Sequence, residues 1–285
     1  MGIQGDSRFG VRGTFRRAWV NQQGAEWYTT AQVGNVLDFY SEFYQPVSLQ
    51  RPAFILPSVG VSISPLSVFK DTERIARYNV TRSTLGLDLG VNLFGEDGEL
   101  RIGAAFGHVA ADRDTGDPEL PEETSNESGL RAALRYDTLD NPFLPRGGQR
   151  LSLDLRAPQS FMGADLTFTR AEGRWTWALS SGANTLAGHA QLGAAIGGDM
   201  PYYDQFALGG FLQLSGYANE EFRGNQVAFG SLIYYRLLSA LTPPLGRGIY
   251  LGASLEIGAL QDTAIRTRTL GIRELTEADT RFGGS

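Results

Sequence analysis

The chain has 285 residues, a formal net charge of −6 and no cysteine. The lack of cysteine excludes a disulfide scaffold, a thiol nucleophile and a thiolate metal site. Lysine and arginine gather in no run, which argues against nucleic acid and against an anionic membrane surface as partners. Glycine is abundant, with 36 residues, and Tyr and Phe dominate the aromatic residues. This composition is typical of many strands that turn tightly at a membrane interface.

No segment approaches the ~18 consecutive apolar residues of a transmembrane helix. A membrane-spanning β-strand needs only ~9–11 residues, with every second side chain apolar. Residues 1–10 lack the charged and then apolar order of a signal peptide. If the protein reaches an outer membrane, we therefore expect its signal to lie upstream of Met1.

Apolar and polar side chains alternate along several segments. In residues 84–93, Leu85 and Leu87 fall on one face, whereas Asp88 and Asn92 fall on the other. A period of two predicts a β-strand with one apolar face. The same alternation recurs in residues 8–16, 100–107, 130–137, 151–156 and 251–258.

One apolar face per strand fits a soluble β-sandwich, whose apolar face points inward, or a membrane barrel, whose apolar face meets lipid. Three features favour the barrel: strands longer than the ~5–6 residues of globular proteins, aromatic residues near strand ends, and short connections that alternate with longer ones. The aromatic clusters are Trp19, Trp27 and Tyr28, then Phe39, Tyr40, Phe43 and Tyr44, then Tyr234 and Tyr235. The compact connections are 21–26, 48–52, 95–98, 140–148, 180–183 and 242–248, and the longest are 112–128 and 197–224.

We therefore predict an all-β protein, with a single antiparallel transmembrane β-barrel domain over residues 1–285. About twelve strands are expected in this segment. The long connections are expected outside the cell and the short turns in the periplasm.

The alternation changes phase in residues 74–84. Arg77 and Asn79 share parity with Leu85, so polar side chains continue the apolar face of the strand. Either a β-bulge or strand ends that project above the lipid would explain the change.

The segment Tyr136–Gly148 reads Tyr-Asp-Thr-Leu-Asp-Asn-Pro-Phe-Leu-Pro-Arg-Gly-Gly. A strand that ends in Tyr-Asp, followed by a proline-containing turn and a glycine, resembles the bacterial surface-antigen barrel. BamA-like assembly factors and two-partner-secretion transporters share that barrel. The resemblance marks Asp137, Asp140, Pro145 and Gly147 as a turn motif.

A second resemblance lies in residues 206–225, where Leu214, Ser215, Gly216 and Tyr217 follow one another. In that superfamily a long extracellular loop folds back into the lumen, and its tip carries Val/Ile-Arg-Gly-Phe/Tyr. Gly216 and Tyr217 match this motif, but Ser215 stands where the arginine is usual.

The family's arginine pairs with an acid on a later strand, and the resemblance places that acid at Glu256. Without the arginine the usual charge-assisted hydrogen bond cannot form, so Glu256 needs another partner or stays hydrated, and Arg223 is one candidate. The Ser-Gly-Tyr version most resembles the barrels of patatin-like (type Vd) autotransporters, which carry an N-terminal lipase domain and one connecting periplasmic domain. We expect the tip, residues 214–217, to be a structural clamp rather than a substrate reader.

The resemblance implies a barrel of about sixteen strands, within the range of outer-membrane barrels. The resemblance therefore implies that the segment lacks its first and last strands, and that the connecting domain and any passenger lie outside it. Whether the segment closes alone is left open, because two unpaired edges would face lipid.

The residues offer little catalytic chemistry. The sequence has no Gly-x-Ser-x-Gly elbow, Walker loop or dinucleotide fingerprint, so we expect no catalytic residue and no cofactor. His108 and His189 each lie within a strand pattern, and a site shared by the two is a minor alternative. Residues 112–117 with Glu123 have the wrong order for a calcium loop, so a solvated acidic loop is favoured and no metal is expected.

Charged side chains on the inner faces could line a conduit. We favour a resting lumen that is closed by mutually paired charges and by the inserted loop. These charged residues are Arg12, Arg131, Arg135, Asp137, Asp154 and Arg156.

The expected function is that of an integral protein of the bacterial outer membrane, which anchors or exports an N-terminal passenger polypeptide of the patatin-like lipase type. Any lipase activity would belong to that passenger, outside this chain. The expected partners are outer-membrane lipid, the passenger and the barrel-assembly machinery, and a homodimer stays open. Two alternatives remain: an outer-membrane protein assembly and insertion factor, and a soluble β-sandwich binding protein.

Overall fold

The computed structural model describes residues 10–48, 51–70, 73–95, 97–240, 248–261 and 280–284. These residues cluster into two compact units. Unit 1 consists of the described residues within 1–93, 100–132 and 156–167, and unit 2 of those within 94–99, 133–155 and 168–285.

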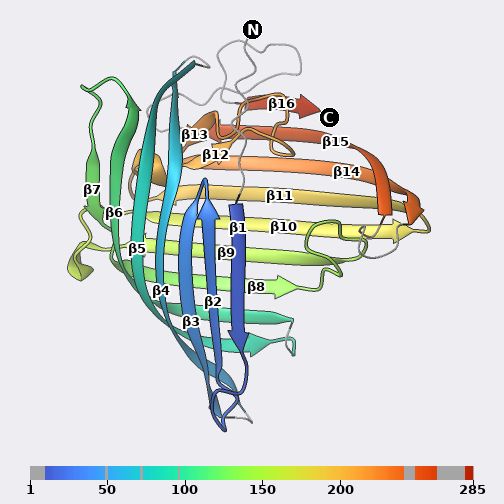
Figure 1. The fold of residues 1–285 in the computed structure, drawn as a ribbon, viewed down its shortest axis with the longest axis horizontal. Helices are drawn as coiled ribbons and strands as arrows, with labels where there is room; N and C mark the ends of the chain where they lie inside the picture. Colours follow the sequence, from blue (N-terminus) through green and yellow to red (C-terminus); the bar gives the residue numbers. More distant parts are fainter. Residues whose placement is uncertain are drawn as a thin grey trace. The chain divides into compact units, whose positions relative to one another are not determined.

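Nearly all of the described chain is β-strand, which confirms the all-β prediction (Figure 1). The described part also holds the short 3-10 helices η1 (Ser160–Met162) and η2 (Tyr202–Asp204). No helix in these residues is long and apolar enough to cross a membrane. The strands are β1 (Gly10–Arg17), β2 (Glu26–Gly34), β3 (Leu37–Ser48), β4 (Arg51–Lys70), β5 (Glu73–Leu93), β6 (Gly98–Gly116), β7 (Glu123–Asn126), β8 (Gly129–Asp137), β9 (Gly148–Pro158), β10 (Thr169–Ser181), β11 (Asn184–Ile196), β12 (Phe206–Leu208), β13 (Phe222–Gly224), β14 (Gln226–Ala240), β15 (Gly248–Gln261) and β16 (Thr280–Gly284).

Hydrogen bonding places the strands of each unit in chain order. Unit 1 has the order β1-β2-β3-β4-β5-β6, and β7 also pairs with β6. In unit 2, strands β9, β10, β11, β14, β15 and β16 follow one another, whereas β12 and β13 form a separate ribbon. The long pairs β4–β5 and β14–β15 are antiparallel and lie side by side in Figure 1. This succession of antiparallel neighbours is the arrangement that the alternating pattern predicted.

Apolar side chains on these strands are exposed and charged ones are buried, which is the reverse of the pattern in a soluble protein. On β5, Leu87 is 53% exposed, whereas the next residue, Asp88, is only 5% exposed. In unit 2 the same contrast separates the exposed Leu255 from the buried Glu256. We call the leucine side the outer face and the acidic side the inner face of each unit. Exposed leucine beside buried carboxylate contradicts the soluble β-sandwich alternative, since that fold buries its apolar face.

The polarity of the faces inverts along β5. Its outer face carries Arg77 and Asn79 beyond Leu85, while Tyr78 and Val80 are buried on the inner face. The pairing of β4 with β5 keeps one register from Val68 opposite Ala76 to Ala53 opposite Val91, and it shifts only beyond Val68. A bulge therefore does not cause the change of phase at residues 77–83.

Strand β6 shows the same inversion. Its outer face changes from Ile102 and Phe106 to His108, whereas Val109 and Ala111 are buried on the inner face. Beyond Leu85 on β5 and Phe106 on β6, the sheet thus has polar side chains on its outer face and an apolar core on its inner face. This is the arrangement of a sheet whose outer face meets water. Of the two explanations offered by the sequence, strand ends that project beyond the lipid fit this geometry.

The same region corrects one predicted connection. Residues 112–128 were expected to form a long loop, but β6 continues to Gly116 and β7 pairs with it, for example through Val109 opposite Ser125. The segment between them folds back over the inner face, where the Tyr78 hydroxyl donates to the Pro121 carbonyl at 3.0 Å. The sequence did not reveal this strand because its acidic residues lie on the outer face of a strand end that projects beyond the lipid. Such a run of charged residues has the same sequence pattern as a loop. Residues 8–9 of the predicted strand 8–16, residues 49–50 of the predicted connection 48–52 and residues 242–247 of the predicted connection 242–248 lie outside the described residues.

Ion pairs lie on the inner face of unit 1. Arg131 donates from Nε to Oδ1 of Asp88 at 2.7 Å, and Arg82 and Arg156 both reach Oε2 of Glu127, at 2.5 and 2.7 Å. Buried carboxylates need such partners, because an isolated charge loses its hydration on burial. The other predicted inner charges are also bound: Arg12 to Gln32 in unit 1, and in unit 2 Arg135 to Asp154 and Arg150 to Asp137.

Candidate functional site

The connection from β11 to β14, residues 197–225, packs on the inner face of unit 2. It contains η2 and the ribbon β12–β13, in which Phe206 lies opposite Gly224. The connection, called the inner loop below, is fixed by a cluster of buried apolar side chains from the loop and from the strands beneath it. The cluster consists of Phe168, Met200, Phe206, Leu208, Leu214, Val227, Phe229 and Leu260.

The tip of the inner loop is bound to Glu256 on β15. Oε2 of this carboxylate accepts the backbone N–H groups of Leu214 and Ser215 at 2.7 and 2.8 Å. Oε1 accepts the hydroxyls of Ser215 and Ser254 at 2.9 and 2.8 Å. Glu256 is 4% exposed, so these donors replace most of its hydration. We call this set of contacts the tip clasp.

The backbone of the tip is shaped to present these donors. Leu212 and Leu214 have φ values of 60° and 72°, a region that costs a non-glycine residue about 1–2 kcal/mol. Left-handed residues in a turn aim successive N–H groups at one point and so form an anion-binding nest. The Ser215 hydroxyl closes the turn by accepting the N–H of Leu212 at 3.0 Å. The tip therefore holds a carboxylate with amide and hydroxyl dipoles.

Gly258 makes room for the tip on β15. A Cβ placed on Gly258 would lie 2.9 Å from Cδ1 of Leu208 and 3.0 Å from Cδ1 of Leu214. The glycine lies two residues after Glu256, on the same face of the strand. Glu256 and Gly258 thus serve the same contact in two ways. Glu256 binds the backbone of the tip, and Gly258 leaves space for the side chain of Leu214.

Arg223, the candidate partner of Glu256, lies elsewhere. It donates to Glu220 at 2.6 Å, and its guanidinium lies over the ring of Tyr202. Within the described residues, Glu256 makes no ion pair with an arginine. From the sequence, Ser215 could be recognised only as a residue that stands where the family's arginine is usual. The sequence carried no sign that backbone N–H groups would replace the missing charge, because the nest depends on backbone angles.

The other members of the motif have packing roles. The ring of Tyr217 meets Phe222 edge to face at 5.0 Å, and both border the buried cluster. A Cβ on Gly216 would meet nothing within 4 Å, so the local space does not demand glycine there. Ser254, which the sequence analysis missed, could have been found from its parity with Glu256.

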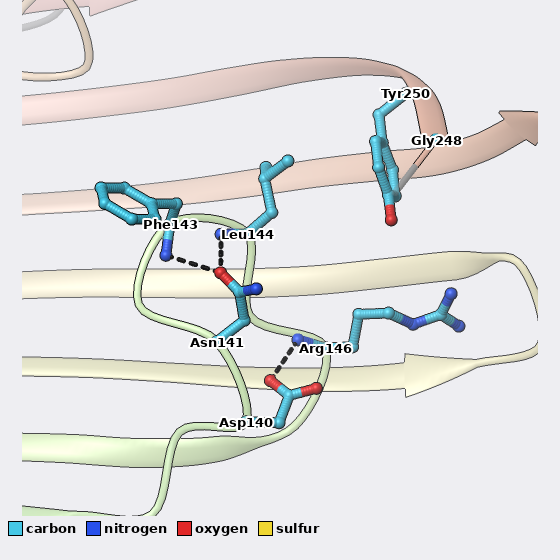
Figure 2. A pocket seen from close by; sticks show the side chains of 7 residues that line it. All are labelled: Asp140, Asn141, Phe143, Leu144, Arg146, Gly248 and Tyr250. Carbon is cyan, nitrogen blue, oxygen red and sulfur yellow. Dashed lines mark hydrogen bonds between the residues drawn. The ribbon is translucent and has the colours of Figure 1, made fainter. Parts of the chain in front are cut away.

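The predicted turn motif forms a compact bend between β8 and β9 in unit 2. Asp140 accepts the N–H of Arg146 at 2.8 Å, and Asn141 accepts the N–H groups of Phe143 and Leu144 at 2.8 and 3.0 Å. Figure 2 shows these bonds, with the ring of Tyr250 on the other side of a pocket that the turn lines. Side-chain carboxylates and amides that bind their own backbone are the usual means of fixing such a turn.

The turn is also bound to the strands of unit 2. The Pro145 carbonyl accepts the hydroxyl of the buried Tyr235, and the Arg146 carbonyl accepts the Ser180 hydroxyl at 2.6 Å. Asp137 pairs with Arg150 across the base of the turn at 2.7 Å. The glycine that the backbone requires is Gly148, with a φ of 92°.

The histidines have local partners. His108 Nδ1 lies 3.0 Å from Oδ1 of Asn126 in unit 1, and His189 Nδ1 lies 2.9 Å from Oγ1 of Thr176 in unit 2. In the acidic segment 112–117, for which calcium was the disfavoured interpretation, Asp114 pairs with Arg77 at 3.7 Å. No group of three or more metal-binding side chains occurs among the described residues.

Comparisons with known proteins agree with this geometry. A family model for the Omp85 superfamily domain matches residues 23–266. The crystal structure of BamA from Haemophilus ducreyi lacking POTRA domains 1–3 matches with a TM-score of 0.70 and 11% identity, over 90% of this chain and 55% of that chain. A comparison with curated protein sequences found no match.

CdiB proteins match as well. CdiB from Escherichia coli gives a TM-score of 0.59 and 12% identity, over 89% of this chain and 49% of that chain. CdiB from Acinetobacter baumannii gives a TM-score of 0.51 and 10% identity, over 97% of this chain and 52% of that chain. The chain spans about half the length of these solved structures. The identities are low, so the likeness is one of fold: an antiparallel transmembrane β-barrel.

The family model covers most of the chain, and the exposed apolar face, the buried ion pairs and the inner loop fit the same class. The chain belongs to the Omp85 superfamily and is an integral β-barrel protein of the bacterial outer membrane.

Proposed function

We propose that the chain is the membrane translocator of a longer protein, and that it anchors or exports an N-terminal passenger polypeptide of the patatin-like lipase type. The observation that carries the proposal is the tip clasp. In assembly factors and two-partner transporters, the resemblance implies an arginine at the loop tip that pairs with the acid. Here the contact of Ser215 with Glu256 takes the place of that ion pair, and the Ser-Gly-Tyr tip most resembles patatin-like autotransporters.

The inner faces support a polypeptide as the transported substrate. Their carboxylates are already bound, as in Asp88 with Arg131 and Glu127 with Arg82 and Arg156. A wall of paired charges offers hydrogen bonds without a strong net charge, and it therefore suits a chain of mixed sequence. The barrel itself would need no catalytic group, because any lipase chemistry would reside in the passenger.

The test uses the full-length gene with an epitope tag in the N-terminal domain. We expect the tag to be digested by protease added to intact cells, and to be protected when the barrel is deleted. A tag that stays protected in cells whose barrel is correctly inserted would overturn the proposal.

The same cells test the alternative role in assembly. An assembly factor is expected to lower the amounts of other outer-membrane proteins when it is depleted, whereas a dedicated translocator leaves them unchanged. Quantifying these proteins beside tag accessibility separates the two roles in one strain.

A further inference from the structure

A second contact holds the inner loop, at a place that the tip clasp does not reach. Phe206, at the start of β12, is 1% exposed, and its ring lies against Gly193 of β11. A Cβ built on Gly193 would lie 2.5 Å from both Cε1 and Cζ of Phe206. Any side chain at residue 193 would therefore occupy the space of the ring.

The ring also meets a cation. The guanidinium carbon of Arg170, on β10, lies 4.2 Å from the centroid of the Phe206 ring, within the range of a cation–π interaction. A guanidinium beside a buried ring is attracted more strongly than one in water, since less solvent screens it. Gly193 and Arg170 together form what we call the stem seat.

The cation of the stem seat is held in place by a buried acid. Arg170 donates to Oε2 of Glu172 at 2.7 Å, while Oε1 of Glu172 accepts Gln191 at 2.8 Å and pairs with Arg174 at 2.6 Å. Glu172 lies directly opposite Gly193 in the β10–β11 register. The acid thus fixes the guanidinium at the point where the glycine leaves room for the ring.

The stem seat and the tip clasp differ in strands and in chemistry. The stem seat uses β10 and β11, whereas Glu256 lies on β15, and β14 lies between β11 and β15 in the sheet. The tip clasp depends on hydrogen bonds to one carboxylate and on a turn with positive φ at Leu212 and Leu214. Opening the tip would relieve that backbone strain, but the stem ribbon β12–β13 has regular pairing and no such strain to lose.

We propose that Arg170, Glu172 and Gly193 are positioning residues that anchor the stem of the inner loop independently of its tip. The tip can then leave Glu256 while Phe206 stays in the stem seat, so the loop opens as a hinged flap. The two anchors follow from the contacts themselves, but the use of the opening for passage of a polypeptide rests on the proposed function.

This chain has no cysteine, so it gives a direct test once any cysteine elsewhere in the full-length protein has been replaced by serine. In the full-length protein in intact cells, Leu214→Cys reports on the tip and Leu208→Cys on the stem, and both leucines are 1% exposed. Labelling by a membrane-impermeant maleimide measures how often each residue opens. The boiling-dependent mobility shift on SDS gels shows that each variant is folded.

Each anchor is removed in turn. Glu256→Ala is expected to speed labelling at Leu214→Cys about tenfold, with a clearly smaller change at Leu208→Cys, which packs beside Leu214 at Gly258 but is also held in the ribbon β12–β13. Gly193→Ala and Arg170→Gln are expected to speed labelling at Leu208→Cys about fivefold. Arg170→Lys should restore part of the protection, because it keeps a cation near the ring. The matched control is Gly230→Ala on β14, where an added Cβ meets only Ile257, at 3.8 Å.

The outcomes separate this inference from the proposed function. If either change exposes both reporters equally, the loop moves as one body and the two-anchor inference is wrong. If the reporters respond separately but the tagged passenger never reaches the surface, the inference stands and the proposed export function fails. If Arg170→Lys labels as fast as Arg170→Gln, the cation–π contact is not the anchor.

Discussion

Ser215 gives Glu256 both its backbone N–H, at 2.8 Å, and its hydroxyl, at 2.9 Å. A residue that lacks positive charge thus binds a buried carboxylate in a position where the superfamily resemblance implies arginine. Two neutral dipoles from one residue, with a third from Leu214, supply directed hydrogen bonds in place of an ion pair.

The first prediction concerns the acid of the tip clasp. Glu256→Ala leaves the N–H groups of Leu214 and Ser215 without their acceptor, and should destabilise the barrel by roughly 1–3 kcal/mol. Glu256→Gln should cost less, because the amide oxygen can accept both N–H groups while its NH₂ faces the serine hydroxyls. The temperature of the mobility shift on SDS gels measures both. Equal losses would contradict the hydrogen-bond account.

The second prediction concerns the hydroxyl of Ser215. Ser215→Ala keeps the backbone N–H bond to Glu256 and loses only the hydroxyl bonds, so it should cost about 0.5–1.5 kcal/mol. Ser41→Ala, in unit 1, removes hydrogen bonds to Trp27 and Thr29 but should leave labelling of Leu214→Cys unchanged. If Leu214→Cys were labelled faster in both the Ser215→Ala and the Ser41→Ala variant, the labelling rate would report general loosening of the protein and not opening of the tip.

The third prediction assigns the faces of β5. Leu87→Arg places a charge on the outer face within the lipid and should cost about 2–4 kcal/mol. Asn92→Arg changes the inner face and loses one hydrogen bond to Tyr44, for about 1 kcal/mol. Refolding yield in detergent and the thermal mobility shift measure both, and equal effects would contradict the assignment.

The fourth prediction places the water boundary on the same strand. Asn79→Cys and Ser83→Cys should react with a membrane-impermeant maleimide on intact cells, whereas Leu87→Cys should not. All three share the outer face, so only height distinguishes them. Protection of Asn79→Cys would mean that the polar end of the strand is covered and does not stand in water.

The fifth prediction compares two adjacent glycines in the β8–β9 turn. Gly148→Ala should destabilise the turn, because φ is 92° and the new Cβ would lie 2.0 Å from the Thr138 carbonyl. Gly147→Ala should have little effect, since nothing lies within 4 Å of its Cβ. Protease sensitivity of the turn in refolded protein measures the difference. The reverse order would show that the turn adopts another conformation in the membrane.

Much of the fold could be predicted from the sequence, because alternation along a strand depends only on which face meets lipid. Leu85 and Asp88 settled the two faces of β5 in this way. Strand ends above the lipid were harder to recognise: outward Arg77 and Asp114 break the apolar pattern although the strand continues. The register of β4 with β5 resolved that ambiguity, and register is not visible in one strand alone.

The site was predictable in part. Glu256 and the tip residues were identified by resemblance, and the structure brings them together. The donors to Glu256, the room at Gly258 and the seat of Phe206 were not foreseen. Each of them depends on contacts between residues far apart in sequence, such as Leu214 and Glu256, which are separated by 42 positions.

That separation also bears on the order in which the protein folds. Most strands pair with their neighbours in sequence, so successive hairpins need only short-range chain closure, which is fast. The inner loop is synthesised before β15, and its tip has no carboxylate to bind until β15 has paired with β14. Closure of the tip is therefore expected to follow the pairing of β15 with β14, so that Glu256 is bound only when this part of the sheet is complete.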